Sequence, residues 1–149
     1  MIHIDSMVLM ALVDEKDDLY KEARHIVNGR QNATYAVSLI AIGEVINRLS
    51  EKRDLPSAID ASDELVKLLG QGKVVVRTFG GDRSCLELSV KLMELDAILK
   101  PADALIPTSM LCDESSSGLY SNDRVLTFSK VLRDYARSNG RWIKIPPGF

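Results

Sequence analysis

The sequence predicts an α/β fold in which one largely parallel sheet is covered by helices on both faces. Short apolar or β-branched runs alternate with longer stretches of helical spacing, which is the order expected of successive βαβ units. The short runs do not separate into an apolar and a polar face, as expected for strands buried on both sides. The helical stretches are longer than the strands, so helix should exceed strand.

The elements follow from local signals along the chain. Strands are expected at residues 2–4, 34–38, 73–78, 119–121 and 142–145. Helices are expected at 7–13, 19–29, 39–49, 56–69 and 85–95, from 101 onward, from 125 onward and at 131–136. Ser6 is expected to cap the first helix, and Pro56 and Pro101 suit the first turns of two others. Helix ends or turns are expected at Gly29, Asn32, Gly70, Gly72 and Gly80–Asp82.

The totals are those of one ordinary globular domain spanning residues 1–149, since 149 residues can bury a substantial core. The formal net charge is −2, so any bound polyanion must be held by a local patch or a metal ion. The basic residues gather near the C-terminal end: Arg124, Lys130, Arg133, Arg137, Arg141 and Lys144. This patch is either a solvated helical face or an RNA-facing surface.

Cys85 and Cys112 lie far apart in the sequence and form no C-x-x-C pair, so a structural zinc site is not expected. We expect two reduced thiols in a cytoplasmic protein. The chain starts directly on a strand pattern, without a secretory leader pattern. No apolar run approaches the roughly 20 residues that a membrane span requires.

Four acids stand out by their context. Asp5 and Asp123 each follow a predicted strand, where ligands bind in open parallel sheets. Asp103 lies in the first turn of a predicted helix, and Glu44 lies in an apolar helix, where a carboxylate is costly unless it is paired or bound. The alternatives are that Asp5 only caps the next helix and that Glu44 pairs with Arg48 one turn later.

Four carboxylates brought together cannot all remain ionised without a positive counter-charge. A divalent cation would supply it. An all-oxygen ligand set suits Mg²⁺ or Mn²⁺, and neither ion requires histidine or cysteine. The set Asp5, Glu44, Asp103 and Asp123 therefore predicts a metal-dependent site, provided that the fold gathers it.

At these residues the sequence resembles the PIN-domain ribonucleases over nearly the whole chain. The likeness is to the VapC-type toxin nucleases of prokaryotic toxin–antitoxin pairs. It rests on the order and spacing of four segments: Ile4-Asp5-Ser6, Ser38 with Glu44, Ala102-Asp103-Ala104-Leu105-Ile106 and Ser121-Asn122-Asp123-Arg124.

The resemblance implies a PIN-like three-layer sandwich with a central parallel sheet of four or five strands. It implies a metal-dependent endoribonuclease that leaves 5′-phosphate and 3′-hydroxyl ends. The implied catalytic and metal-binding residues are Asp5, Glu44, Asp103 and Asp123. The implied residues that orient them are Ser6, Ser38 and Asn122, which could equally be caps and turn residues. The implied partners are RNA, an antitoxin protein and a second copy of this chain, paired through the leucines at 65–69 and 88–95.

Pro107 departs from the family pattern. A proline inside the helix that starts at Pro101 removes a hydrogen bond and costs about 3 kcal/mol or a kink, which would affect how Asp103 is aimed. Two other functions remain open within this fold: an RNA-processing or rRNA-maturation nuclease, and a catalytically inactive binding scaffold. A phosphorelay receiver domain is disfavoured because Asp5 is a single acid and residues 76–78 contain none.

Overall fold

Five parallel strands form the centre of the computed structural model, which describes residues 1–149 except 30–32, 53 and 79–82. The strands are β1 (Ile2–Ile4), β2 (Tyr35–Ser38), β3 (Val74–Arg77), β4 (Gly118–Tyr120) and β5 (Trp142–Lys144). The helices are α1 (Ser6–Val13), α2 (Tyr20–Gly29), α3 (Leu39–Lys52), α4 (Leu55–Gly70), α5 (Arg83–Leu95), α6 (Pro101–Cys112), α7 (Arg124–Phe128) and α8 (Lys130–Ser138). The predicted parallel α/β sheet is confirmed.

The sheet has the order β3-β2-β1-β4-β5, so β1 lies in the middle between β2 and β4. All residues of β1, β2 and β4 are buried, which explains why these runs show no polar face. Near the β5 edge of the sheet, Gly118 of β4 lies directly under the Trp142 ring, where a Cβ atom would clash. The Trp142 ring in turn packs against Tyr120 at a centroid distance of 5.0 Å.

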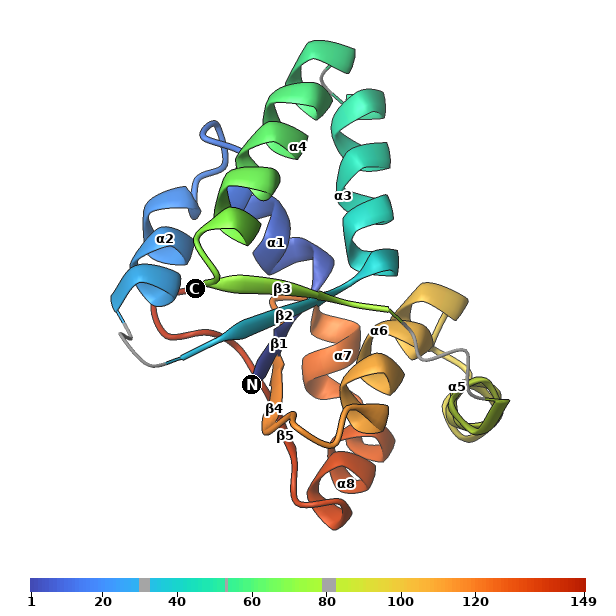
Figure 1. The fold of residues 1–149 in the computed structure, drawn as a ribbon. Helices are drawn as coiled ribbons and strands as arrows, with labels where there is room; N and C mark the ends of the chain where they lie inside the picture. Colours follow the sequence, from blue (N-terminus) through green and yellow to red (C-terminus); the bar gives the residue numbers. More distant parts are fainter. Residues whose placement is uncertain (30–32, 53, 79–82) are drawn as a thin grey trace.

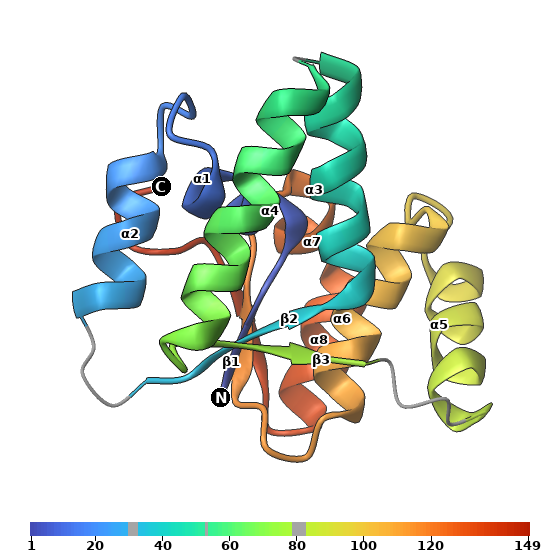
Figure 2. The ribbon, with the colours of Figure 1, turned by 45° about the horizontal axis from the view of Figure 1, so that its top comes forward.

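The helices form two groups on opposite faces of the sheet (Figures 1 and 2). Helices α1 to α4 contact one another on one face, and α5 to α8 pack together on the other. The core lies between each group and the sheet, with Ile4, Leu12 and Tyr35 almost fully buried on or beside the central strands. The chain ends beside α2, far along the sequence but adjacent in space.

One local expectation about a helix end needs correction. Asp5, rather than Ser6, is the N-cap of α1, because the Asp5 carboxylate accepts the backbone N–H of Val8 at 2.8 Å. Helix α6 continues through Pro107 to Cys112, so the proline does not end it. Helix α2 ends at Gly29 as predicted. Asn32 and the turn at residues 80–82 lie outside the described residues.

The expectation of two reduced cysteines is wrong. Cys85 and Cys112 are joined in a disulfide, with their Cα atoms 6.2 Å apart. The bond links the first turn of α5 to the last residue of α6. The sequence pattern missed it because the two residues are separated by 27 positions, and only the antiparallel packing of α5 against α6 brings them together.

The leucine stripes expected to form a dimer interface belong mainly to the core of the chain itself. Leu65, Leu68 and Leu92 are buried, and only Leu95 of the two stripes is largely exposed. The alternative that these stripes belong to the core therefore holds for Leu65, Leu68 and Leu92. Homodimerisation stays a prediction. Within the described ranges, no helix has both the length and the apolar character needed to span a membrane.

Candidate active site of four carboxylates

Asp5 is the most buried of the four predicted acids, with 1% of its surface exposed. It follows β1 directly, and its backbone N–H continues the strand ladder to Tyr120 O at 3.0 Å. One carboxylate oxygen accepts the N–H of Val8, and the other accepts the hydroxyl of Ser121. Asp5 therefore does cap a helix, and it does so at the carboxyl end of the central strand.

Ser121 is a residue of the candidate site that the sequence analysis did not single out. Its hydroxyl donates to Asp5 and accepts the backbone N–H of Asp123 at 3.0 Å, so it connects two of the four acids. It is completely buried and follows β4, the neighbour of β1 in the sheet. The available signal was its position as the first polar residue after a buried strand, one place before Asn122.

Asp123 and Asp103 occupy two further helix starts. Asp123 is the N-cap of α7 and accepts the N–H of Val125 at 2.7 Å. Asp103 lies in the first turn of α6 and accepts the N–H of Lys100 at 3.1 Å. With Asp5, three aspartates thus lie at three helix N-termini, where the helix dipole favours negative charge. Within the described part of the chain, each of Asp103 and Asp123 keeps one carboxylate oxygen without a hydrogen-bond donor.

Glu44 lies half-buried in the second turn of α3. The alternative that it pairs with Arg48 is not supported: among the described residues no ion pair joins them, and Arg48 instead donates to the sulfur of Met7 at 2.8 Å. Helix α3 contacts α6, and the negative charge of Glu44 contributes to raising the pKa of Asp103. The charge of Glu44 therefore acts on one of the three aspartates, Asp103.

The raised pKa values of Asp5 and Asp103 have causes that include charges of the other acids. Burial, more than any other cause, raises the pKa of Asp5 to about 6, and the charge of Asp123 adds to the increase. Burial likewise raises the pKa of Asp103, with further contributions from the charges of Asp123 and Glu44. Repulsion thus links the acids in a series, and the fold has brought together residues from four distant segments. We call Asp5, Glu44, Asp103 and Asp123 the carboxylate site.

The three residues expected to orient the acids have other contacts. Ser38 ends β2 and its hydroxyl accepts the N–H of Ala41 at 3.1 Å, so it caps α3. Ser6 is buried in the first turn of α1, and Asn122 is half-buried beside Ser121. Among the described residues, neither Ser6 nor Asn122 makes a side-chain hydrogen bond to an acid. An orienting role for them stays a prediction.

Comparison with solved structures bears on the fold. The chain matches VapC20 of Mycobacterium tuberculosis, described as a sarcin-ricin loop cleaving toxin, with a TM-score of 0.65 and 15% identity, over 83% of this chain and 90% of that one. It also matches VapBC2 of Rickettsia felis, solved bound to a DNA fragment from their promoter, with a TM-score of 0.62 and 16% identity, over 97% of this chain and 98% of that one. This chain has the VapC-type PIN fold. The expected resemblance and fold class are therefore confirmed.

These matches are structural only. The sequence matches no protein-family model and no curated protein. At 15% and 16% identity, the likeness to the VapC proteins establishes the fold, and the roles of individual residues must be argued from the carboxylate site itself.

The donor chemistry of the carboxylate site fits Mg²⁺ or Mn²⁺. In the described residues, no three of the histidine, cysteine, aspartate and glutamate side chains form a ready-made metal cage. Mg²⁺ does not require one, because it usually keeps several waters and binds through one or two carboxylates together with substrate phosphate oxygens. The oxygens of Asp103 and Asp123 that lack donors are suited to that open arrangement, whereas both oxygens of Asp5 already accept hydrogen bonds.

We expect Asp103→Asn to melt at a higher temperature than the parent protein when both are measured in chelator. The asparagine oxygen can still accept the N–H of Lys100, while the repulsion from Asp123 and Glu44 is removed. The gain should be at most about 1 kcal/mol, because the residue is partly exposed and solvent screens the repulsion. The variant should also lose most of the stabilisation that Mn²⁺ gives the parent.

Thermal melts of parent and variant, each with chelator and with Mn²⁺, measure both effects. Glu87→Gln on α5 is a matched control, because its carboxylate pairs with Arg83 away from the site. A lower melting temperature for Asp103→Asn in chelator, with an unchanged response to Mn²⁺, would make Asp103 a simple helix cap.

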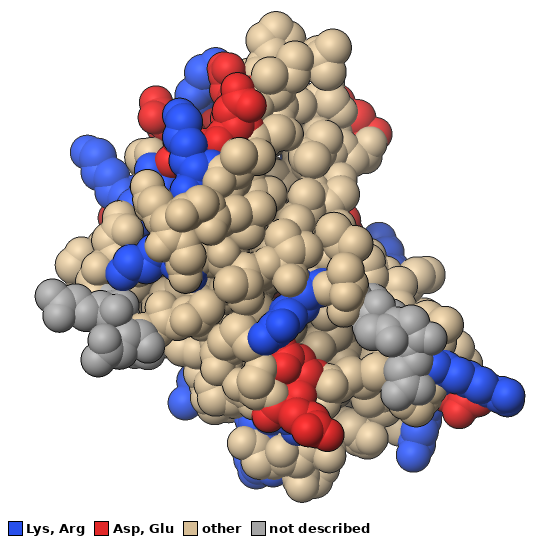
Figure 3. Space-filling model, viewed as in Figure 1, with Lys and Arg blue, Asp and Glu red and all other residues tan. Residues whose placement is uncertain are grey.

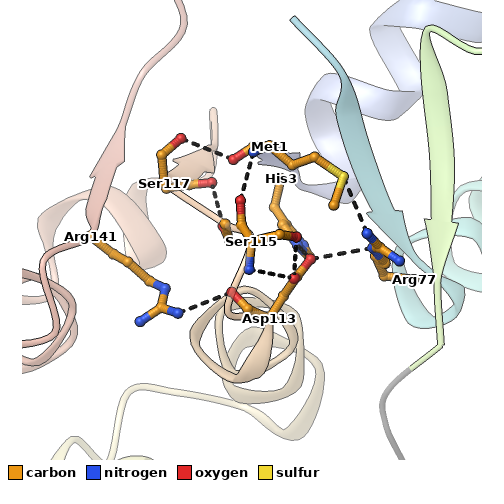
Figure 4. A network of polar contacts seen from close by, with 9 residues as sticks. Met1, His3, Arg77, Asp113, Ser115, Ser117 and Arg141 are labelled. Carbon is orange, nitrogen blue, oxygen red and sulfur yellow. Dashed lines mark hydrogen bonds and ion pairs between the residues drawn. The ribbon is translucent and has the colours of Figure 1, made fainter.

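A second polar network lies at the amino end of the sheet and is structural (Figure 4). Buried His3 donates to Asp113 at 3.0 Å, and Arg77 approaches the same carboxylate at 3.4 Å. Burial is the main cause that lowers the pKa of His3, which favours its neutral form. Burial alone would raise the pKa of Asp113, but hydrogen bonds from Ser115 and His3 bring it to about 2. This network fixes β1 to the loop between α6 and β4.

A cavity lined by described residues lies away from the four acids. It measures about 310 Å³ between the end of α1 and α4, and its lining includes Asp14, Asp60 and Glu64 but none of the four acids. On the face shown in Figure 3, acidic and basic side chains are interspersed over this region rather than separated. The carboxylate site is thus outside this cavity.

Proposed function

We propose that this protein is a metal-dependent endoribonuclease and the toxin component of a toxin–antitoxin pair. One observation carries the proposal: four acids from distant segments occur together in a VapC-type fold, where the charge of Asp123 acts on Asp5 and the charges of Asp123 and Glu44 act on Asp103. No function of a helix cap requires that four acids share one site, because each cap needs only one.

The reaction follows from the properties of these residues. Asp103, Asp123 and Glu44 would hold Mg²⁺ or Mn²⁺, which when bound lowers the pKa of a water nucleophile and neutralises phosphate charge. Asp5, fixed by Val8 and Ser121, positions the neighbouring backbone of Asp123 and adds negative charge to the site. Attack by water on the phosphorus, with departure of the 3′ oxygen, leaves 5′-phosphate and 3′-hydroxyl ends.

The toxin assignment draws on the two structural neighbours. VapC20 is described as a sarcin-ricin loop cleaving toxin, and VapBC2 is a pair solved on its own promoter DNA. The match covers 97% of this chain and 98% of the chain that it matches in the second of these. We therefore propose an antitoxin protein as the partner and RNA as the substrate.

We expect mixed-sequence RNA to be cleaved in the presence of Mn²⁺ and left intact in chelator. Restoring Mn²⁺ should restore cleavage, and the products should accept a ligase that requires a 5′-phosphate. Cleavage that persists in chelator would exclude the metal mechanism. Products that end in a 2′,3′-cyclic phosphate would exclude it as well, because they arise from attack by the ribose hydroxyl. Asp103→Asn with intact folding serves as the control for contaminating nuclease.

A further inference from the structure

Phe128 is an exposed aromatic residue directly beside the carboxylate site. It is 65% exposed and ends α7, the helix that Asp123 caps. Among the described residues it is the only aromatic side chain in the exposed class. Five residues at 1.5 Å per residue place it about 7.5 Å from Asp123 along the helix axis. Most of the ring is exposed, so it adds little to the core and is accessible to a ligand.

Helix α7 presents one exposed face that combines this ring with a cation. Arg124 and Phe128 are four residues apart, so they lie on the same side of the helix, and both are exposed. Leu126 and Thr127, on the other side, are buried. The helix therefore turns an arginine and a phenylalanine outward immediately after Asp123.

A hydrogen bond holds this face next to the start of α6. Ser129, which follows Phe128, donates from its hydroxyl to the Asp96 carboxylate at 2.6 Å. Residues 96–100 lead directly into α6; Ile98 there is 69% exposed, and Lys100 is exposed beside Asp103. We call Phe128, Arg124, Ile98 and Lys100 the Phe128 patch.

In the described part of the chain, the cations of the patch form no ion pair, and the charge of Lys100 acts on neighbouring Asp103. Within the described residues, Arg124 and Lys100 form no ion pair, and neither does neighbouring Lys130. Elsewhere on the surface, cations such as Arg83 and Arg137 are paired with acids on their own helices. Unpaired cations around an exposed ring are the combination that single-stranded nucleic-acid sites use: the cations follow the phosphates, and the ring stacks on a base.

We propose that the Phe128 patch binds an unpaired RNA strand, with one base stacked on Phe128 and with Arg124 and Lys100 contacting the neighbouring phosphates. The proposal rests on the ribonuclease function proposed above and adds to it a residue, Phe128, that positions the strand. A base inside a duplex has no free face to offer the ring, so duplex RNA would not use this contact. Phe128 is a positioning residue: it fixes the strand, and the carboxylate site performs the chemistry.

The test measures binding separately from cleavage. A fluorescein-labelled, mixed-sequence single-stranded oligoribonucleotide is titrated with protein in the Asp103→Asn background, and its anisotropy is followed. Phe128→Ala should weaken binding roughly five- to 150-fold, the range found for removing one stacked base. Phe128→Trp should restore binding, and its fluorescence should be quenched by the RNA more than that of the parent, whose one tryptophan is Trp142. Val66→Ala on α4, equally exposed at 65%, is the matched control and should bind like the parent.

The outcomes separate the two proposals. If the parent cleaves RNA in a chelator-sensitive manner but Phe128→Ala binds the single strand as tightly as the parent background, the stacking proposal is overturned and the nuclease stands. If the Phe128→Ala loss is equal for duplex and single-stranded probes, the single-strand specificity is overturned. If Phe128→Ala instead abolishes only the binding of a protein partner, the patch is a protein-docking site. Absence of both cleavage and RNA binding in the parent overturns both proposals.

Discussion

Reduction of the Cys85–Cys112 disulfide is expected to lower the free energy of unfolding by about 3 to 4 kcal/mol. The bond closes a loop with a sequence separation of 27 residues. In the chain-entropy account, a cross-link stabilises the folded state because it restricts the unfolded chain. The gain is about 3 kcal/mol for a short loop and about 4.7 kcal/mol for a long one, and this loop lies between them. The effect should be large because α5 packs chiefly against α6, the helix to which the bond joins it.

Urea denaturation of the parent protein with and without a thiol-free reductant measures the change. Reducing the parent keeps every side-chain atom in place, so the difference reports the cross-link rather than a cavity. A double variant, Cys85→Ser with Cys112→Ser, should be destabilised and should not respond to the reductant. If a thiol assay shows complete reduction while the midpoint of the parent does not move, the cross-link does not stabilise the native state.

The second large effect is a pH dependence caused by Asp5. Burial raises its pKa from 3.8 to about 6, a difference that corresponds to about 3 kcal/mol. The folded protein therefore binds this proton more tightly than the unfolded chain does. In chelator, the Asp5 contribution should make the protein more stable as the pH falls from 6 to 4, and the full penalty of ionised Asp5 should be present above pH 6.

Two other groups change the stability in the opposite direction as the pH falls, so their contributions must be subtracted. The pKa of His3 is lowered by burial, so its contribution weakens the fold as the pH falls below the usual histidine range. The pKa of Asp113 is lowered to about 2, so its contribution is lost only below the usual aspartate range. Asp5→Asn retains both groups, and its carbonyl oxygen can still accept the N–H of Val8.

The measurement is therefore a difference between parent and Asp5→Asn. Free energies of unfolding are determined for both in chelator at several pH values from 4 to 7.5. The parent should gain stability relative to the variant by up to about 3 kcal/mol as the pH falls through this window. Parallel curves would show that Asp5 has an ordinary pKa and that its burial does not penalise the charged form.

The sequence by itself determined the fold class and the choice of acids. Strands such as residues 35–38 must be buried on both faces in a parallel sheet, so their apolar character is visible without a structure. Asp5 and Asp123 were identifiable because each follows such a strand, and the carboxyl ends of parallel strands meet at one edge. The strands and their ends could be predicted because both depend on the pattern of neighbouring residues.

Only the tertiary structure decided which groups actually touch. Ser121 and Asp5 are 116 positions apart, and they meet because β1 and β4 are neighbours in the sheet. Cys85 and Cys112 became a pair in the same way, through the packing of α5 on α6. Pro107 was expected to remove a hydrogen bond or to kink its helix. Helix α6 continues through it, because seven of its residues are buried and packing outweighs one lost hydrogen bond. Contacts between distant segments depend on strand order and helix packing, and these are properties of the whole chain rather than of any local pattern.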